Sequence, residues 1–190
     1  MHSAELIIEP MPDADALSEL TVTAEERTTA ASFGSERRRC EYLMWRSMIR
    51  RRLGSDTAIG YDSTGAPVLL NRPARIGVSH CSGYVAVVIS DNRCAVDIES
   101  VERDFQKISS RYISRSESGL SDDPRLACAL WCAKETLYKY AGRTGLDFLR
   151  DICVETVDFE RGIVVGRICG GDSVLMRLAC CHDCLVVWVG

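Results

Sequence analysis

The chain has 190 residues, 46% of them hydrophobic and 26% charged, which is typical of a globular protein long enough to bury a sizeable core. Its 23 Lys and Arg against 27 Asp and Glu give a net charge of −4, which argues against a general binder of nucleic acid. The sequence has neither an apolar run as long as a membrane span nor a signal-peptide pattern. We therefore expect a cytoplasmic protein that contacts no membrane, with its ten cysteines reduced.

The first predicted helix lies in a strongly basic segment, residues 36–52, which carries seven arginines against two glutamates. Apolar side chains recur there at helical spacing, at Tyr42, Trp45, Ile49 and Leu53. Gly54 follows as a C-terminal cap, so we expect a helix over about 40–53. Arg39, Arg46 and Arg50 lie on a second stripe of this helix. That stripe is either a solvated basic face or a phosphate-binding face.

The remaining pattern alternates short strands with one further long helix. Strands are predicted over 67–70, 76–78, 84–89, 94–99, 152–157, 162–168, 174–179 and 185–189. Short helices are expected around 105–112 and 114–119, and a long one over 126–141.

A weak internal repeat relates the segments 79–90 and 179–190. We therefore predict an α+β protein of two related lobes, 1–93 and 94–190. The lobes would be related by a pseudo-twofold axis, each a long helix on a small antiparallel sheet, with the active site in the cleft between them.

Two carboxylates alternate along one predicted strand. Asp97 and Glu99 point to the same face, while Val96 and Ile98 point into a core. Carboxylates so placed repel each other unless a cation lies between them, and oxygen ligands of this kind suit Mg²⁺. The alternative is an edge strand with a solvated polar face.

Three further polar features could serve a phosphate substrate. Glu135 and Lys139 share a face of the long helix, either as a surface ion pair or as a third carboxylate with an ammonium group for a phosphate. Ser79 and His80 lie where a strand meets a loop and could donate hydrogen bonds to a phosphate, although a single loop histidine is usually just solvated.

Taken together, three segments resemble a known family. They read SHCSGYVAV at 79–87, AVDIE at 95–99 and WCAKETLYK at 131–139. In this order and spacing they resemble the 4′-phosphopantetheinyl transferases of the monomeric, two-lobed, surfactin-synthetase-activating type. The resemblance implies Mg²⁺-dependent transfer of the 4′-phosphopantetheine group of coenzyme A to a serine of an apo acyl or peptidyl carrier protein, with release of 3′,5′-ADP. Such carriers serve fatty-acid, polyketide and nonribosomal peptide synthesis.

The resemblance also implies roles for individual residues. Asp97, Glu99 and Glu135 would hold Mg²⁺, and Asp97, Glu135 and Lys139 would form the catalytic set. Glu135 is the best-placed base for the carrier serine, directly or through a metal-bound water. Lys139 would contact the phosphates of coenzyme A.

Other positions would bind the rest of coenzyme A. Ser79 and His80 would contact its phosphates, and Arg46 its 3′-phosphate. The tripeptide Gly65-Ala66-Pro67 stands where many members have Gly-Lys-Pro, so Gly65 and Pro67 would line the site while Ala66 lacks the lysine contact. Arg39 or Arg50 could replace that contact.

Two other functions remain open at this point. One is a Mg²⁺-dependent phosphohydrolase of a nucleotide-like substrate that uses the same three carboxylates. The other is a non-enzymatic nucleic-acid-binding module that uses the arginine stripe. The cluster Cys180–Cys184 is assigned to a strand pattern rather than to zinc, because the chain has no second ligand pair at zinc-finger spacing.

Overall fold

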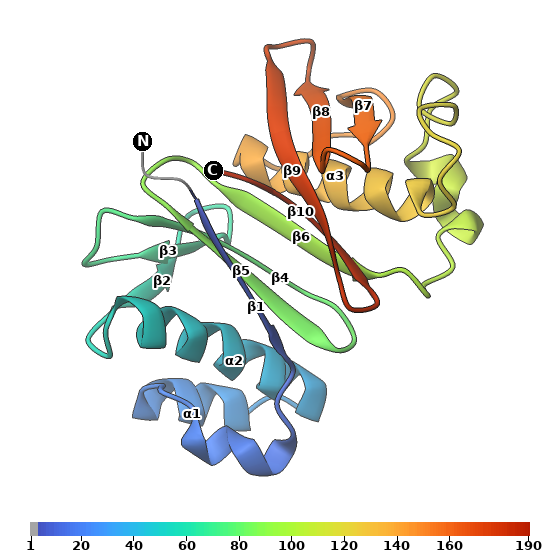
Figure 1. The fold of residues 1–190 in the computed structure, drawn as a ribbon. Coiled ribbons are helices and arrows are strands. Elements are labelled where there is room, and N and C mark those ends of the chain that lie inside the picture. The colour runs from blue at the N-terminus through green and yellow to red at the C-terminus, as the bar shows by residue number, and fades with distance from the viewer. Residues whose placement is uncertain (1–3) are drawn as a thin grey trace.

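The computed structural model describes residues 4–190 and contains both helices and antiparallel sheets (Figure 1). The helices are α1 (Ala24–Ala31), α2 (Glu36–Leu53) and α3 (Leu126–Ala141), with short 3₁₀ helices η1 (Ala14–Glu19) and η2 (Gln106–Arg111). The strands are β1 (Glu5–Pro10), β2 (Ile59–Tyr61), β3 (Pro67–Leu69), β4 (Arg75–His80), β5 (Tyr84–Ser90), β6 (Ala95–Ser100), β7 (Ile152–Asp158), β8 (Ile163–Ile168), β9 (Ser173–Cys181) and β10 (Cys184–Val189).

Sheet membership changes between β5 and β6. The first sheet has the order β1-β5-β4, and the second has the order β6-β10-β9-β8-β7, both antiparallel. β2 and β3 form a separate hairpin. An α+β fold is therefore confirmed, with sheets of unequal size.

The two sheets pack face to face between their helices, which gives four layers (Figure 1). Alternation along the strands supplies an apolar side chain to each face. The layer between α2 and the first sheet contains Met48, Ile49, Val85 and Val87. The layer between the sheets contains Ala86, Val88, Val96, Ile98 and Val186. The layer between α3 and the second sheet contains Leu130, Leu137, Leu185 and Val187.

β4 approaches β6 closely, which brings the two sheets together beside the site described below. A Cβ at Gly77 would lie 2.8 Å from Cγ1 of Val88 and 3.0 Å from Cα of Ala95, so only glycine fits this crossing without a shift. The two hairpin tips also meet, because the thiols of Cys81 and Cys184 lie 3.4 Å apart. The position of β4 relative to β6 is thus fixed by backbone contact.

Most predicted elements are confirmed. The first long helix begins at residue 36 rather than 40, because Ser35 caps it by accepting a hydrogen bond from the Arg38 N–H. The prediction of a helix at 114–119 is wrong, since that segment forms turns. The segments 79–90 and 179–190 both form hairpins, but the pseudo-twofold relation and the boundary at 93/94 stay predictions.

The sequence analysis did not foresee β1 and α1. The signal for α1 was a capping box, in which Thr23 and Glu26 each accept a hydrogen bond from the other's backbone N–H. Among residues 4–190, no helix combines the length and the apolar content that crossing a bilayer requires.

Candidate active site

Three carboxylates gather where β6 meets α3. Val96 and Ile98 are buried between the two sheets, so the alternating residues Asp97 and Glu99 face the opposite side, against which α3 packs. Glu135 comes from α3 itself. Burial raises the pKa of both glutamates, and charge repulsion from Asp97 raises it further, as expected for neighbouring carboxylates.

Asp97 is the buried centre of this group, with 5% of its surface exposed. Its Oδ1 accepts hydrogen bonds from Lys139 Nζ at 2.7 Å and from Ser79 Oγ at 2.8 Å. Its Oδ2 is buried and has no hydrogen-bond partner among the described residues. A buried carboxylate oxygen without a partner is costly, so the alternative of a solvated strand face is wrong for Asp97.

Glu99 and Glu135 differ in how their charge is compensated. Oε1 of Glu99 pairs with the Arg103 guanidinium and also accepts a hydrogen bond from Trp131 Nε1 at 3.1 Å. Within residues 4–190 the Glu135 carboxylate makes neither a hydrogen bond nor an ion pair, so the surface ion pair with Lys139 is not formed. Burial is the main cause that raises the pKa of each glutamate, followed by Asp97.

The donor set suits a hard divalent cation, although the ligands do not converge as they stand. In the part of the chain described, no three metal-ligating side chains lie close enough together to hold an ion. Lys139 forms an ion pair with one carboxylate oxygen of Asp97, and Arg103 forms one with a carboxylate oxygen of Glu99. The unpartnered Oδ2 of Asp97 and the unpaired carboxylate of Glu135 fit an oxygen-preferring ion such as Mg²⁺.

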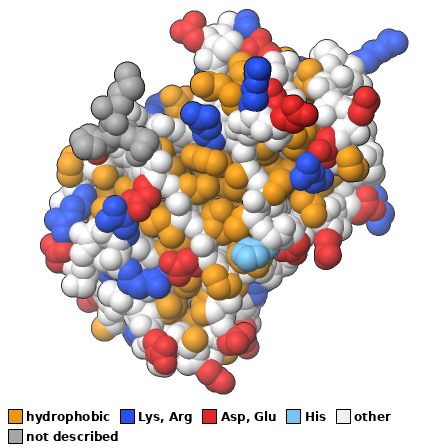
Figure 2. Space-filling model, viewed as in Figure 1, with side chains coloured by type: hydrophobic (Ala, Val, Ile, Leu, Met, Phe, Trp, Pro, Cys, Tyr) orange, Lys and Arg blue, Asp and Glu red, His pale blue; other side chains and the backbone are white. Residues whose placement is uncertain are grey.

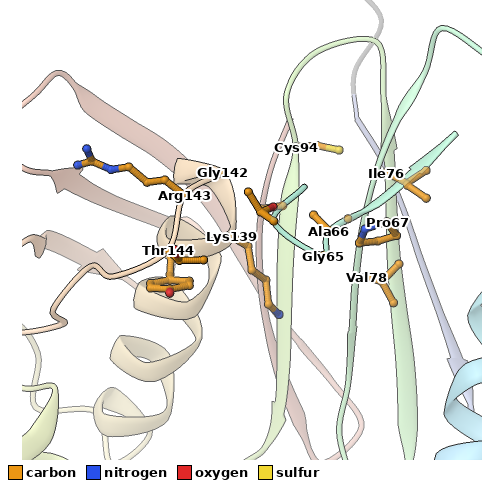
Figure 3. A pocket seen from close by; sticks show the side chains of 14 residues that line it. Gly65, Ala66, Pro67, Ile76, Val78, Cys94, Lys139, Gly142, Arg143 and Thr144 are labelled. Atoms are coloured by element: carbon orange, nitrogen blue, oxygen red, sulfur yellow. The ribbon is translucent and has the colours of Figure 1, made fainter. Parts of the chain in front are cut away.

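Lys139 also reaches a cavity of about 290 Å³ between α3 and the first sheet. Figure 3 shows its side chain extending from α3 between that helix and the strands, with Gly65, Ala66 and Pro67 across from it. Ile76 and Val78 of β4 make this part of the lining apolar. The predicted residues Gly65, Pro67 and Lys139 are therefore brought together at one cavity.

Two further depressions continue from this cavity and form with it one trough. The next, of about 310 Å³, shares Pro67, Val78 and Lys139 with the cavity and adds His80. The third, of about 260 Å³, shares Trp45, Tyr61 and His80 with the second and adds Phe33, Arg38, Glu41 and Tyr42. We call this continuous feature the Lys139 trough. It runs from α3 to the start of α2.

His80 lies in the middle of the Lys139 trough. Its Nδ1 is 3.2 Å from Oε1 of Glu41 on α2. Burial lowers the pKa of His80, Glu41 raises it, and the cations Lys139 and Arg37 lower it further. The pKa of His80 therefore lies below its ordinary value, which favours the neutral imidazole.

Arg46 does not lie on the trough, contrary to the sequence-based expectation. It is 2% exposed, its Nε is 3.3 Å from Oε1 of Glu26, and its guanidinium carbon lies 3.5 Å from the ring centroid of Tyr42. Its Nη2 donates a hydrogen bond to the hydroxyl of Tyr61 at 2.6 Å. Arg38 lines the trough instead.

The expected basic stripe is largely neutralised by internal ion pairs. Arg50 is buried and pairs with Glu26 through two hydrogen bonds of 2.5 and 2.9 Å. The neighbouring Arg51 and Arg52, which are not on the stripe, pair with acidic residues of β1. On the face drawn in Figure 2, basic and acidic side chains are interspersed. Arg46 and Arg50 of the stripe therefore offer little free charge to a nucleic acid.

The Ser79 hydroxyl also differs from expectation. It donates its proton to Asp97 and accepts the backbone N–H of Ile98 at 3.4 Å, so it bridges β4 and β6. This bond joins the two sheets at the carboxylate site and leaves the hydroxyl no proton for a phosphate. The proximity of β4 to β6 that permits it has no local sequence signal.

Sequence reasoning also missed a buried ion pair directly beside Glu135. Lys134 is fully buried, and its Nζ lies 2.8 Å from Oε1 of Glu117 and donates to the carbonyls of Phe148 and Ile152. Glu117 also accepts the N–H of Val154 at 2.8 Å. The ion pair links the segment between β6 and α3, which contains Glu117, to helix α3, which carries Glu135 and Lys139.

The cluster Cys180–Cys184 forms the hairpin between β9 and β10. Cys184 is buried whereas Cys180 is exposed, so their thiols face different surroundings. The strand assignment made for this segment is confirmed.

Comparison with known proteins adds one finding. A family model described as the 4′-phosphopantetheinyl transferase superfamily matches residues 93–175. The matched part includes β6 and α3, and with them Asp97, Glu99, Glu135 and Lys139. A search of curated proteins found no match. The part of the chain that carries the three carboxylates and Lys139 is thus similar to the 4′-phosphopantetheinyl transferase superfamily, whose members act on carrier proteins with coenzyme A as substrate.

Proposed function

We propose that this protein transfers the 4′-phosphopantetheine group of coenzyme A to a serine of an apo carrier protein and releases 3′,5′-ADP. It does so as a monomer of the two-lobed type and depends on Mg²⁺. The observation that carries the proposal is the position of Lys139, which pairs with Asp97 at the carboxylate site and also lines the trough. The family match over residues 93–175 supports the same reaction class.

The trough suits an extended molecule with both apolar and anionic parts. Lys139 and His80 lie along its middle, where they can donate to the pyrophosphate of coenzyme A. Trp45 and Tyr61 give the adjoining depression an aromatic lining suited to adenine. Arg38 lines this depression whereas Arg46 is buried, so we assign the contact with the 3′-phosphate to Arg38.

Asp97, Glu99 and Glu135 are the residues that would hold Mg²⁺. When bound, the ion supplies positive charge to the pyrophosphate, which the family's reaction requires. Their fit to the ion rests on the unpartnered Oδ2 of Asp97 and on the charge repulsion that Asp97 exerts on Glu99 and Glu135.

Glu135 is the best candidate to accept the proton of the carrier serine. Its carboxylate is half-buried and unpaired, and burial together with Asp97 raises its pKa, which makes it a stronger base. The serine oxygen then forms a bond to the β-phosphorus of coenzyme A, and the bond from that phosphorus to the bridging oxygen breaks. The electron pair leaves with 3′,5′-ADP, whose developing charge the ammonium group of Lys139 neutralises.

The test is intact-mass analysis of a panel of apo carrier proteins incubated with the protein, coenzyme A and Mg²⁺. We expect one carrier to gain the mass of a single phosphopantetheinyl group, and the gain to disappear with chelator. Glu135→Gln should abolish it, whereas Glu160→Gln, on the exposed turn before β8, should not. Release of free phosphopantetheine without any carrier would support the phosphohydrolase instead. Salt-sensitive binding of DNA or RNA without transfer would support the nucleic-acid module.

A further inference from the structure

Arg103 is a cation placed at the carboxylate site by two independent contacts. It lies in the loop after β6, four residues beyond Glu99, and its Nη1 pairs with Oε1 of that glutamate. The same oxygen accepts the indole N–H of Trp131 at 3.1 Å. Oε1 of Glu99 therefore already has two donors and is not free to coordinate a metal ion.

The Arg103 guanidinium packs against two aromatic rings. Its central carbon lies 5.0 Å from the ring centroid of Phe105 and 5.1 Å from that of Trp131. Phe105 is buried, and Trp131 is fixed on α3 by a second aromatic contact, an edge-to-face pair with Tyr112 at 5.1 Å. A guanidinium held over two rings is more ordered than an ordinary surface arginine. These contacts therefore hold Arg103 in an ordered position at the carboxylate site.

The charge of Arg103 acts on more than one of the carboxylates. Its positive charge attracts Glu99, with which it is in contact, and also Glu135, with which it makes no hydrogen bond. It therefore offsets part of the repulsion among the acidic groups. A divalent cation bound by the same groups would perform the same electrostatic task.

We propose that Arg103 is a positioning residue that occupies the carboxylate site in the metal-free protein and competes with the divalent cation for Glu99. The inference rests on the proposed function, because it takes Asp97, Glu99 and Glu135 to be the metal ligands. Coordination through Oε1 of Glu99 requires Arg103 to leave that oxygen, and coordination through Oε2 places the cation beside the positive charge of Arg103. Arg103 therefore weakens the affinity for metal and couples metal binding to movement of the loop at 101–105 and to the surroundings of Trp131.

The test measures binding of Mn²⁺ to the full-length protein without coenzyme A, by calorimetry and by the electron paramagnetic resonance signal of free Mn²⁺. Arg103→Gln removes the charge and frees Glu99, so its dissociation constant should be roughly tenfold lower than that of the wild type. Arg103→Lys keeps a charge without the planar fork and should fall between the two. It also serves as the second variant if Arg103→Gln does not fold.

Arg125→Gln is the matched control. Arg125 also pairs with a nearby carboxylate, Asp123, and its guanidinium carbon lies 4.9 Å from the ring centroid of Phe159. Its side chain is 39% exposed, against 43% for Arg103, but its partners are not members of the carboxylate site. Its removal should leave the Mn²⁺ affinity unchanged.

Equal or weaker Mn²⁺ binding by Arg103→Gln would overturn the inference, as would tightening of the same size in Arg125→Gln. Absence of Mn²⁺ binding in every variant would overturn it as well. Transfer by the wild-type protein is scored separately with the carrier panel. It can therefore succeed when the competition by Arg103 fails, which keeps the two proposals distinguishable. A second readout is the rise in unfolding temperature on adding Mg²⁺, which should be larger for Arg103→Gln than for the wild type.

Discussion

Replacing Lys139 by Met separates two consequences of one ammonium group, its ion pair with Asp97 and its contact with substrate. In the structure the group donates to Oδ1 of Asp97 at 2.7 Å and to the Val96 carbonyl at 3.0 Å. Methionine keeps much of the length of the side chain and removes the charge. Asp97 would then retain the Ser79 hydroxyl as its remaining side-chain donor.

The size of the stability loss follows from the burial of the two partners. Removing one partner of a fully buried pair costs about 3–5 kcal/mol, and an exposed pair is worth about 0–1 kcal/mol. The Asp97 side chain is 7% exposed and that of Lys139 is 35% exposed, so this pair lies between the two cases. We expect Lys139→Met to lower the free energy of unfolding by about 2 kcal/mol, which corresponds to about 4–8 °C in Tm for a chain of this length.

The assay pairs urea unfolding of the metal-free protein with transfer at saturating substrates. Lys139→Met should also lower kcat by roughly 10²-fold, because it removes charge at the leaving group. The double variant Lys139→Met/Asp97→Asn should regain part of the stability, since no uncompensated buried carboxylate remains, but not the activity. A stability within about 0.5 kcal/mol of wild type for Lys139→Met would refute the reasoning about the ion pair. A kcat within threefold of wild type would refute the catalytic role.

Three further expectations follow from other contacts. Lys134→Met leaves the buried carboxylate of Glu117 without its cation and should lower the free energy of unfolding in urea by about 3–5 kcal/mol. A decrease below about 1 kcal/mol would contradict the importance of that ion pair. Burial and Asp97 raise the pKa of Glu135, so the native state holds this proton more tightly than the unfolded chain and loses stability as the pH rises above the ordinary value of 4.5. Glu135→Gln should therefore raise Tm near neutral pH without divalent metal, and the difference should disappear in melts at about pH 4. Arg38→Ala should weaken the binding of coenzyme A by about 1.5–3 kcal/mol more than the binding of 3′-dephospho-coenzyme A. Arg46→Ala should lower Tm and weaken the binding of both ligands equally or not at all.

Local spacing along the chain was sufficient to predict the long helices, most strands and the orientation of the carboxylates. A helix repeats about every 3.6 residues and a strand every two, so the pattern around Trp45 and the alternation at Asp97 and Glu99 are properties of short segments. The spacing of the motifs similarly led to the resemblance to the family whose model matches residues 93–175. The edge strand β1 was not predicted, because its apolar residues Leu6, Ile7 and Ile8 are consecutive and do not alternate with polar ones.

The choice of partner for each charged group was decided only by the tertiary structure. Lys139 is one helical turn from Glu135, yet it pairs with Asp97 on another element, and Arg46 turns inward to Glu26 rather than outward to a phosphate. A buried charge requires a compensating partner wherever the packing places one, and that partner can lie anywhere in the sequence. The sequence by itself therefore determined which chemical groups this protein brings to its site. The packing of β4, β6 and α3 decided which of them are held by one another and which, such as Glu135, are left free to react.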